Sequence, residues 1–151
     1  MNSQITINML RTLKWLAILP FLFGCEQARV DALMEELCQK DGGMKIYEKV
    51  VLPADQFRES GIPKFFETWN RSSGSYYFRS DTERLKQSKP TLEKLTFSVI
   101  REIDKKLLAQ YVVYLRIGGG FVWVPGPDPS KSCPSDANDI VFLTYVFLKD
   151  N

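Results

Sequence analysis

Apolar and polar side chains alternate with a period of two residues over Thr91–Ile103 and again over Leu107–Ile117. This period is typical of β-strands, because successive side chains of a strand point to opposite faces of the sheet. The short connection between the two segments is polar and contains Asp104-Lys105. The sequence therefore predicts an antiparallel hairpin with its turn at Asp104-Lys105.

A helical pattern lies earlier in the chain, over residues 26–40. Its apolar side chains recur at spacings of three and four and form one stripe, which comprises Val30, Leu33, Met34, Leu37 and Cys38. Asp41-Gly42-Gly43 follows, and glycine readily adopts the left-handed conformation that ends helices. We expect a helix over 26–40 that packs this stripe against a sheet.

Proline, glycine and apolar runs divide the rest of the chain into shorter segments. The predicted strands are Met44–Leu52, Ser75–Arg79, Glu83–Gln87 and Asp139–Lys149. Pro53–Ser60 is a predicted short helix, and 61–75 and 121–134 are predicted to be irregular. Asp139–Lys149 is apolar on both faces, which is typical of a buried strand and also fits a buried helix. Together the segments predict an α+β fold, with an N-terminal helix packed on an antiparallel sheet of about four to six strands.

The N-terminal segment has the features of an export signal. Arg11 and Lys14 are its only charges, and an apolar run of about a dozen residues leads to Leu22-Phe23-Gly24-Cys25. This tetrapeptide resembles the lipobox of bacterial lipoproteins, although Phe23 is larger than the usual residue. We expect a lipoprotein signal peptide over 1–24, a lipidated Cys25 and a single globular envelope domain over 25–151. Two alternatives stay open: a signal peptide cut elsewhere, and an uncleaved anchor, although the run is shorter than the ~20 residues of a spanning helix.

A lipidated Cys25 predicts where the protein is located. Bacterial lipoproteins carry several acyl chains, palmitate among them, and several chains hold a protein stably in a membrane. The expected location is therefore the cell envelope, with the domain anchored to a membrane by lipid and facing the periplasm. Glu26 follows the lipid site, and it leaves the choice between inner and outer membrane open.

The charge of the mature chain excludes one class of partner. Removing 1–24 would take two of the 20 basic residues and none of the 18 acidic ones, which leaves no net charge. The remaining basic residues are scattered, whereas nucleic-acid-binding domains gather them in a patch or stripe. We expect a membrane contact through the lipid and an envelope protein as partner, and no nucleic acid.

The cysteine count predicts one disulfide. The chain has three cysteines, and lipidation of Cys25 would leave Cys38 and Cys133. Exported proteins enter an oxidising compartment, in which such a pair forms a disulfide. The alternative is two buried free thiols.

The residue types favour a protein without enzymatic activity. The chain contains no histidine, the usual base beside a nucleophilic serine or cysteine, and no cysteine pair at zinc spacing. We therefore expect no catalytic residue, no metal site and no cofactor. Ser130-Lys131-Ser132 could form a serine–lysine pair and is better interpreted as a solvated turn. A pair of carboxylates acting as in glycoside hydrolases is a further hypothesis, although no pair stands out.

Two segments are candidates for binding a partner. The first is the loop of Gly118, Gly119, Gly120, Phe121 and Trp123, where large aromatics stand beside prolines and would provide contact area at low entropic cost. The alternative is that Phe121 and Trp123 cap the core. The second is Ser73-Gly74-Ser75-Tyr76-Tyr77, which resembles a motif of periplasmic lysozyme inhibitors. A binding or structural module of the envelope is thus the favoured function, and an inhibitor of an envelope-directed hydrolase such as lysozyme is the alternative.

Several motifs resemble a family of small, uncharacterised proteobacterial proteins that are predicted lipoproteins. They are 40–48 with Leu52-Pro53, then 100–108, 114–120, Pro125-Gly126-Pro127 and Ser132-Cys133-Pro134. Similar sequences usually have Asp-Gly-Lys in place of Asp104-Lys105-Lys106, and an aromatic with a histidine in place of Asp128-Pro129. The resemblance implies a structural role for Cys133 and no particular activity.

Overall fold

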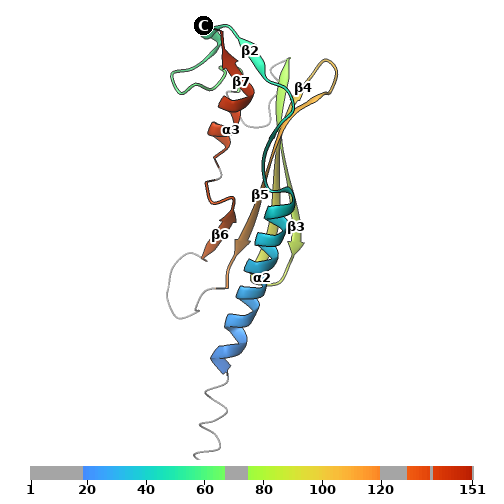
Figure 1. Ribbon diagram of the computed structural model, residues 1–151, viewed down its shortest axis with the longest axis vertical. Helices are drawn as coiled ribbons and strands as arrows, with labels where there is room; N and C mark the ends of the chain where they lie inside the picture. The colour runs from blue at the N-terminus through green and yellow to red at the C-terminus, as the bar shows by residue number, and fades with distance from the viewer. Residues whose placement is uncertain (1–18, 67–74, 120–128, 137, 151) are drawn as a thin grey trace, which may run out of the picture.

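The described part of the chain, residues 19–66, 75–119, 129–136 and 138–150 of a computed structural model, has helices near both ends and a sheet between them (Figure 1). In chain order the elements are α2 (Leu19–Asp41), β1 (Gly43–Ile46), β2 (Val50–Leu52), the 3-10 helix η1 (Ala54–Gln56), β3 (Tyr76–Lys86), β4 (Thr91–Arg101), β5 (Leu107–Ile117), β6 (Ser130–Cys133), α3 (Asp139–Val146) and β7 (Phe147–Lys149). The predicted α+β class is confirmed.

The predicted hairpin is confirmed and forms the centre of the sheet. β4 and β5 pair in antiparallel register, with Phe97 opposite Tyr111. Their connection, which we call the β4–β5 turn, is Glu102–Lys106 and includes the predicted Asp104-Lys105. The order of the sheet is β1-β5-β4-β3, and β6 also pairs with β5. β4 occupies one edge of β5. The other edge of β5 is shared by β1 and β6, which pair with successive parts of this strand.

The two faces of β5 belong to different apolar clusters, as the alternation requires. Ala109, Tyr111 and Val113 lie in the larger cluster, together with α3 and the aromatic rings of the 57–66 segment. Val112 and Tyr114 point the other way and are buried with Val30 and Met34 of α2 and Leu92 of β4. Helix α2 therefore lies on one face of the sheet, and α3 lies on the other near its upper end (Figure 1).

Helix α2 contains the whole predicted helix and is longer at its N-terminal end. It begins at Leu19 and so includes Cys25. It ends at Asp41, where the Gly42 amide donates to the Cys38 carbonyl at 2.8 Å and Gly43 takes a φ of 93°. Leu33 is the exception to the predicted buried stripe, because its side chain is exposed. Within the part of the chain that the structure describes, no helix is both long enough and apolar enough to cross a membrane.

The prediction of a strand over Asp139–Lys149 is wrong for most of its length. Residues 139–146 form α3, and only 147–149 form a strand. Phe142, Leu143 and Val146 are buried at helical spacing, whereas Val141 and Tyr145 are exposed on the outer side. Asn138 begins the helix, because its side-chain oxygen accepts a hydrogen bond from the Val141 amide at 3.3 Å.

Other predicted boundaries are also corrected. The predicted strand Met44–Leu52 is two strands. The Tyr47 and Glu48 amides both donate to the Leu108 carbonyl, and after this point the chain leaves the main sheet. β2 then pairs in parallel with β7. The predicted strands Ser75–Arg79 and Glu83–Gln87 are parts of the single edge strand β3. Residues 79–85 of this strand are exposed on both faces and therefore show no apolar period. Pro53–Ser60 is helical only at Ala54–Gln56, and Ser130–Cys133, within the predicted loop, is strand β6.

The predicted disulfide between Cys38 and Cys133 is present and joins α2 to β6 across 95 residues of sequence. Replacing both cysteines with alanine should lower the free energy of unfolding by about 4 kcal/mol, because the unfolded chain regains the entropy of a long open loop. Denaturant unfolding measures the loss.

The control for this prediction is the wild-type protein in a reducing agent, which should lose a similar amount, whereas the double variant should be insensitive to reduction. Equal stability of the wild type in oxidising and reducing buffers would contradict the assignment.

Candidate functional site

The structure describes only the base of the predicted Gly118–Trp123 binding loop. The Gly118 amide donates to the Pro129 carbonyl at 3.0 Å, which closes the base. Gly118 and Gly119 have φ values of 90° and 94°, a region that favours glycine. An added Cβ at Gly119 would lie 3.2 Å from Cγ of Gln27, so this glycine also allows a close approach to α2. Gly120, Phe121 and Trp123 lie outside the described residues, and their exposure stays a prediction.

Arg116 holds this base together from inside the protein. Its guanidinium donates to the carbonyls of Gly118 and Pro129, and its Nε donates to Asp31 Oδ1 of α2 at 2.7 Å. The residue is only 4% exposed. These contacts explain Gly118 and Gly119 as structural residues that fix the end of β5 against α2.

The other predicted candidates are placed in structural contacts as well. Lys131 pairs with Glu35 at 2.7 Å. The hydrogen bond to Glu35 raises the pKa of Lys131, so the lysine stays protonated and is unsuited to act as the base for Ser130 or Ser132. Tyr76 stacks on Phe65 within the larger apolar cluster. Ser73 and Gly74, from the segment similar to lysozyme inhibitors, lie outside the described residues.

The most unusual surface feature is one that the sequence analysis did not select, the β4–β5 turn. Ile103 is 90% exposed there, far more than any other large apolar side chain among the described residues, the next of which, Val51, is 59% exposed. Ile103 stands alone among charged neighbours, Arg101-Glu102 before it and Asp104-Lys105-Lys106 after it. A large apolar side chain so exposed on an ordered turn is a candidate contact for a partner.

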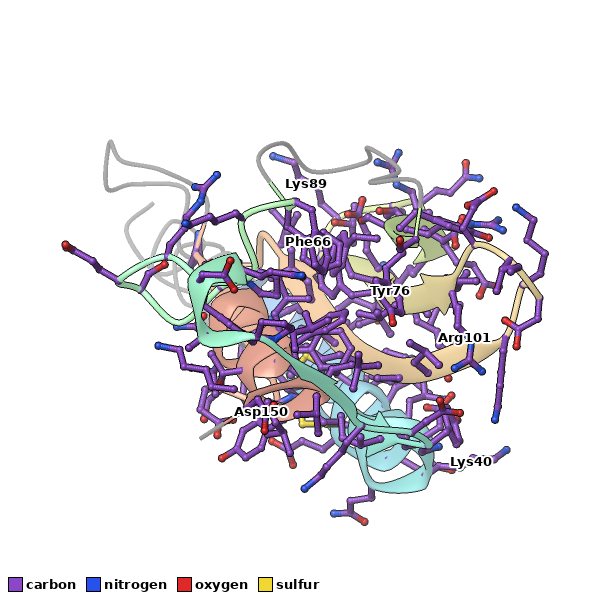
Figure 2. All side chains as sticks on the ribbon, turned by 90° about the horizontal axis from the view of Figure 1, so that it is seen from above. Lys40, Phe66, Tyr76, Lys89, Arg101 and Asp150 are labelled. Carbon is purple, nitrogen blue, oxygen red and sulfur yellow. A yellow bond between two sulfur atoms is a disulfide. The ribbon has the colours of Figure 1, made fainter. Side chains whose placement is uncertain are left out.

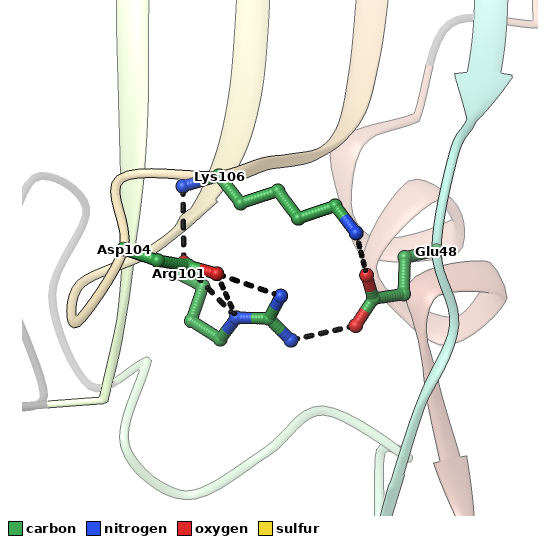
Figure 3. Close-up of polar contacts among 4 residues, drawn as sticks. All are labelled: Glu48, Arg101, Asp104 and Lys106. Carbon is green, nitrogen blue, oxygen red and sulfur yellow. Dashed lines mark hydrogen bonds and ion pairs between the residues drawn. The ribbon is translucent and has the colours of Figure 1, made fainter.

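Ion pairs hold the β4–β5 turn in place (Figure 3). Arg101 donates to both oxygens of Asp104, at 3.0–3.1 Å, and its Nη1 donates to Glu48 Oε1 at 2.6 Å. Lys106 Nζ donates to the second oxygen of Glu48, also at 2.6 Å. Glu48 is therefore shared by two cations, and it ties the turn to the segment between β1 and β2.

The backbone of the turn is fixed by further contacts. The Arg101 amide donates to the Lys106 carbonyl at 2.9 Å, and the Glu102 amide donates to the Ser75 carbonyl at 2.8 Å. Lys105 has a φ of 55°, pairs with Glu102, and places its ammonium 5.5 Å from the centre of the Tyr77 ring. Arg101 lies opposite Tyr76 in the register of β3 and β4, and Tyr76 and Phe66 pack against the larger apolar cluster (Figure 2).

The electrostatics of this cluster suit binding better than acid–base catalysis. Hydrogen bonds from Lys106 and Arg101 lower the pKa of Glu48, and a hydrogen bond from Arg101 lowers the pKa of Asp104. A general acid needs a raised carboxyl pKa, so this pair of acids does not fit that role. No group of three or more potential metal ligands gathers among the residues that the structure describes.

Comparisons of the chain with protein-family models, with curated proteins and with solved structures found no match.

We expect Glu48→Gln to loosen the β4–β5 turn, because the neutral amide binds Arg101 and Lys106 more weakly than the carboxylate does. Amide hydrogen exchange of Arg101, whose N–H is bonded across the turn, should become severalfold faster at pH 7. Glu36→Gln, which removes an exposed acid of α2 far from the turn, is the matched control and should leave this exchange unchanged.

The wild-type turn should also loosen in acid. A carboxyl whose pKa is lowered by folding stabilises the fold above its unfolded pKa, and this contribution is lost as the pH falls through the folded value. Protection of the Arg101 amide should thus decrease below about pH 4. Protection that is the same at pH 3 and pH 7 would show that Glu48 and Asp104 do not hold the turn.

Proposed function

We propose that the protein is a lipid-anchored component of the cell envelope that binds a protein partner through the β4–β5 turn and has no enzymatic activity of its own. The observation that carries the binding proposal is the exposure of Ile103 on a turn whose charged neighbours are paired with one another.

The pairing of the charges is what makes Ile103 suited to binding. Three cations lie in or beside the turn, namely Arg101 at the end of β4 and Lys105 and Lys106 in the turn itself. Each is paired with Glu48, Glu102 or Asp104. A contact that is ordered before binding loses little conformational entropy when it binds. Burial of an isoleucine side chain contributes about 1.5–3 kcal/mol. The complementary site on the partner is an apolar pocket with polar groups around its rim.

The lipid anchor is supported by the sequence at Leu22-Phe23-Gly24-Cys25 and by the position of that segment relative to the turn. Figure 1 places the first turns of α2 at one end of the elongated molecule and the β4–β5 turn toward the other. A lipid at Cys25 would leave Ile103 on the side that faces away from the membrane. The anchor and the binding surface are thus geometrically compatible.

The anchor can be tested by measuring the intact mass of the protein extracted from membranes with detergent. We expect a chain that begins at Cys25 and carries three acyl groups. A Cys25→Ser variant should lack this mass increment and should retain the Cys38–Cys133 disulfide. An uncleaved chain, or a soluble product without acyl groups, would overturn the anchor.

The binding surface can be tested with a photo-crosslinking residue at position 103 in the membrane-anchored protein. We expect one defined protein adduct from this position and none from position 85, because Leu85 is also exposed but lies on the edge strand β3. Ile103→Asp should abolish co-purification of the captured partner. Leu85→Asp, which introduces the same charge elsewhere, should preserve it.

The two variants should fold equally well, since substitutions at such exposed positions change stability by only about 0.5 kcal/mol. Capture of the partner by Ile103→Asp at the wild-type level would refute the role of the turn. If the adduct contains a hydrolase such as lysozyme, an activity assay with the purified pair would decide between simple binding and inhibition.

A further inference from the structure

We propose that the protein forms a two-fold symmetric dimer through the outer surface of the β2–β7 pair, so that a second copy of the chain covers this surface. The surface, which we call the β2–β7 face, consists of Val51 and Leu148 in its centre and of Lys49 and Asp150 at its two ends. This inference depends neither on the binding proposed for Ile103 nor on the lipid anchor.

The first argument is that this pair of parallel strands is covered on only one of its faces. Val50 and Phe147 lie opposite each other and pack into the larger apolar cluster. Val51 and Leu148, the next residues in the same register, point the other way and are 59% and 37% exposed. Parallel strands occur almost only in sheets that are covered on both faces. Among the residues that the structure describes, none provides this second cover for the β2–β7 face.

The second argument is that exposed apolar side chains are concentrated in this part of the molecule. Nine large apolar side chains are exposed in the described part of the chain, and four of them are Val51 and Leu148 together with Val141 and Tyr145 on the outer side of α3. Val141 and Tyr145 lie about one helical turn apart, and Leu148 follows in the strand that continues directly from α3. Apolar side chains that gather in one place, unlike scattered ones, mark an interaction surface.

The third argument is that the charges at the two ends of the face select a second copy as its partner. Lys49 precedes Val51 by two residues and Asp150 follows Leu148 by two, so the alternation along the strands places both on the β2–β7 face. Both residues are exposed, and neither forms an ion pair within the part of the chain that the structure describes. The face is thus apolar in its centre, positive at one end and negative at the other. Such a surface is complementary to a copy of itself that runs in the opposite direction.

The register of the two strands determines how the copies would dock. Val51 lies opposite Leu148, so Lys49 stands two residues before this level and Asp150 stands two residues after it. A two-fold axis that crosses the strands at the level of Val51 and Leu148 therefore brings Lys49 of each copy to the level of Asp150 of the other. The remaining sideways offset is one strand spacing, about 4.8 Å, which a lysine side chain can span. An axis parallel to the strands would instead bring like charges together, so the charges favour antiparallel docking.

The dimer would leave the lipid site outside the interface. The β2–β7 face lies at the end of the molecule opposite to the first turns of α2, and β7 runs away from those turns (Figure 1). Antiparallel docking therefore joins the copies at these ends and places their two Cys25 residues at opposite ends of the pair. Protein solubilised in detergent, in which no shared leaflet orients the copies, is for this reason the sample that tests the dimer.

The dimer is tested by analytical ultracentrifugation of the full chain in detergent over a series of protein concentrations. We expect an equilibrium between monomer and dimer. Val51→Asp should abolish the dimer, because docking would bury an unpaired carboxylate in the apolar centre of the interface. Leu85→Asp, which introduces the same charge at an exposed position of β3, is the matched control and should leave the dimer unchanged. A monomer at every concentration, or a dimer that Val51→Asp does not weaken, would overturn the proposal.

The antiparallel arrangement is tested by exchanging the two charges. Lys49→Glu and Asp150→Lys should each weaken the dimer by about tenfold, because each replaces two exposed ion pairs with contacts between like charges. The two substitutions in one chain restore opposite charges at both contacts, so this double variant should dimerise nearly as well as the wild type. Both positions are exposed, so none of these variants should lose the fold. A double variant that dimerises as weakly as the single ones would overturn the antiparallel docking.

Discussion

The buried guanidinium of Arg116 is the constraint on which the arrangement of this protein depends. A charge that is only 4% exposed must be paired and fully hydrogen-bonded, since the desolvation penalty is otherwise several kcal/mol. Arg116 satisfies this requirement with the carboxylate of Asp31 and the carbonyls of Gly118 and Pro129. One side chain of β5 thereby determines where α2 crosses the sheet, where β5 ends and where the chain returns toward β6.

Two further contacts make α2 rigid with respect to the sheet. The disulfide joins Cys38 to β6. At the end of the helix, Asp41 accepts hydrogen bonds from Lys94 at 2.6 Å and from the Tyr114 hydroxyl at 2.5 Å, and these bonds lower the pKa of the Asp41 carboxyl. The three attachment points of α2, at Asp31, Cys38 and Asp41, lie along one side of the helix. An anchor at the start of α2 is consequently an anchor for the whole domain and for the β4–β5 turn.

The parts of the fold that the sequence predicts are those in which local pattern and burial agree. The hairpin and the helix over 26–40 have a clear period, and the disulfide follows from the cysteine count. The strand β3 has no such period because solvent reaches both of its faces, and α3 was hidden by exposed Val141 and Tyr145, which make an amphipathic helix look uniformly apolar. The capping role of Asn138 was the available signal for α3. Glu48 and Arg101 are 53 residues apart in the sequence, and no local pattern links them. Ile103, in contrast, stands alone in a run of charged residues, and this pattern was a usable sign of an exposed contact on the turn.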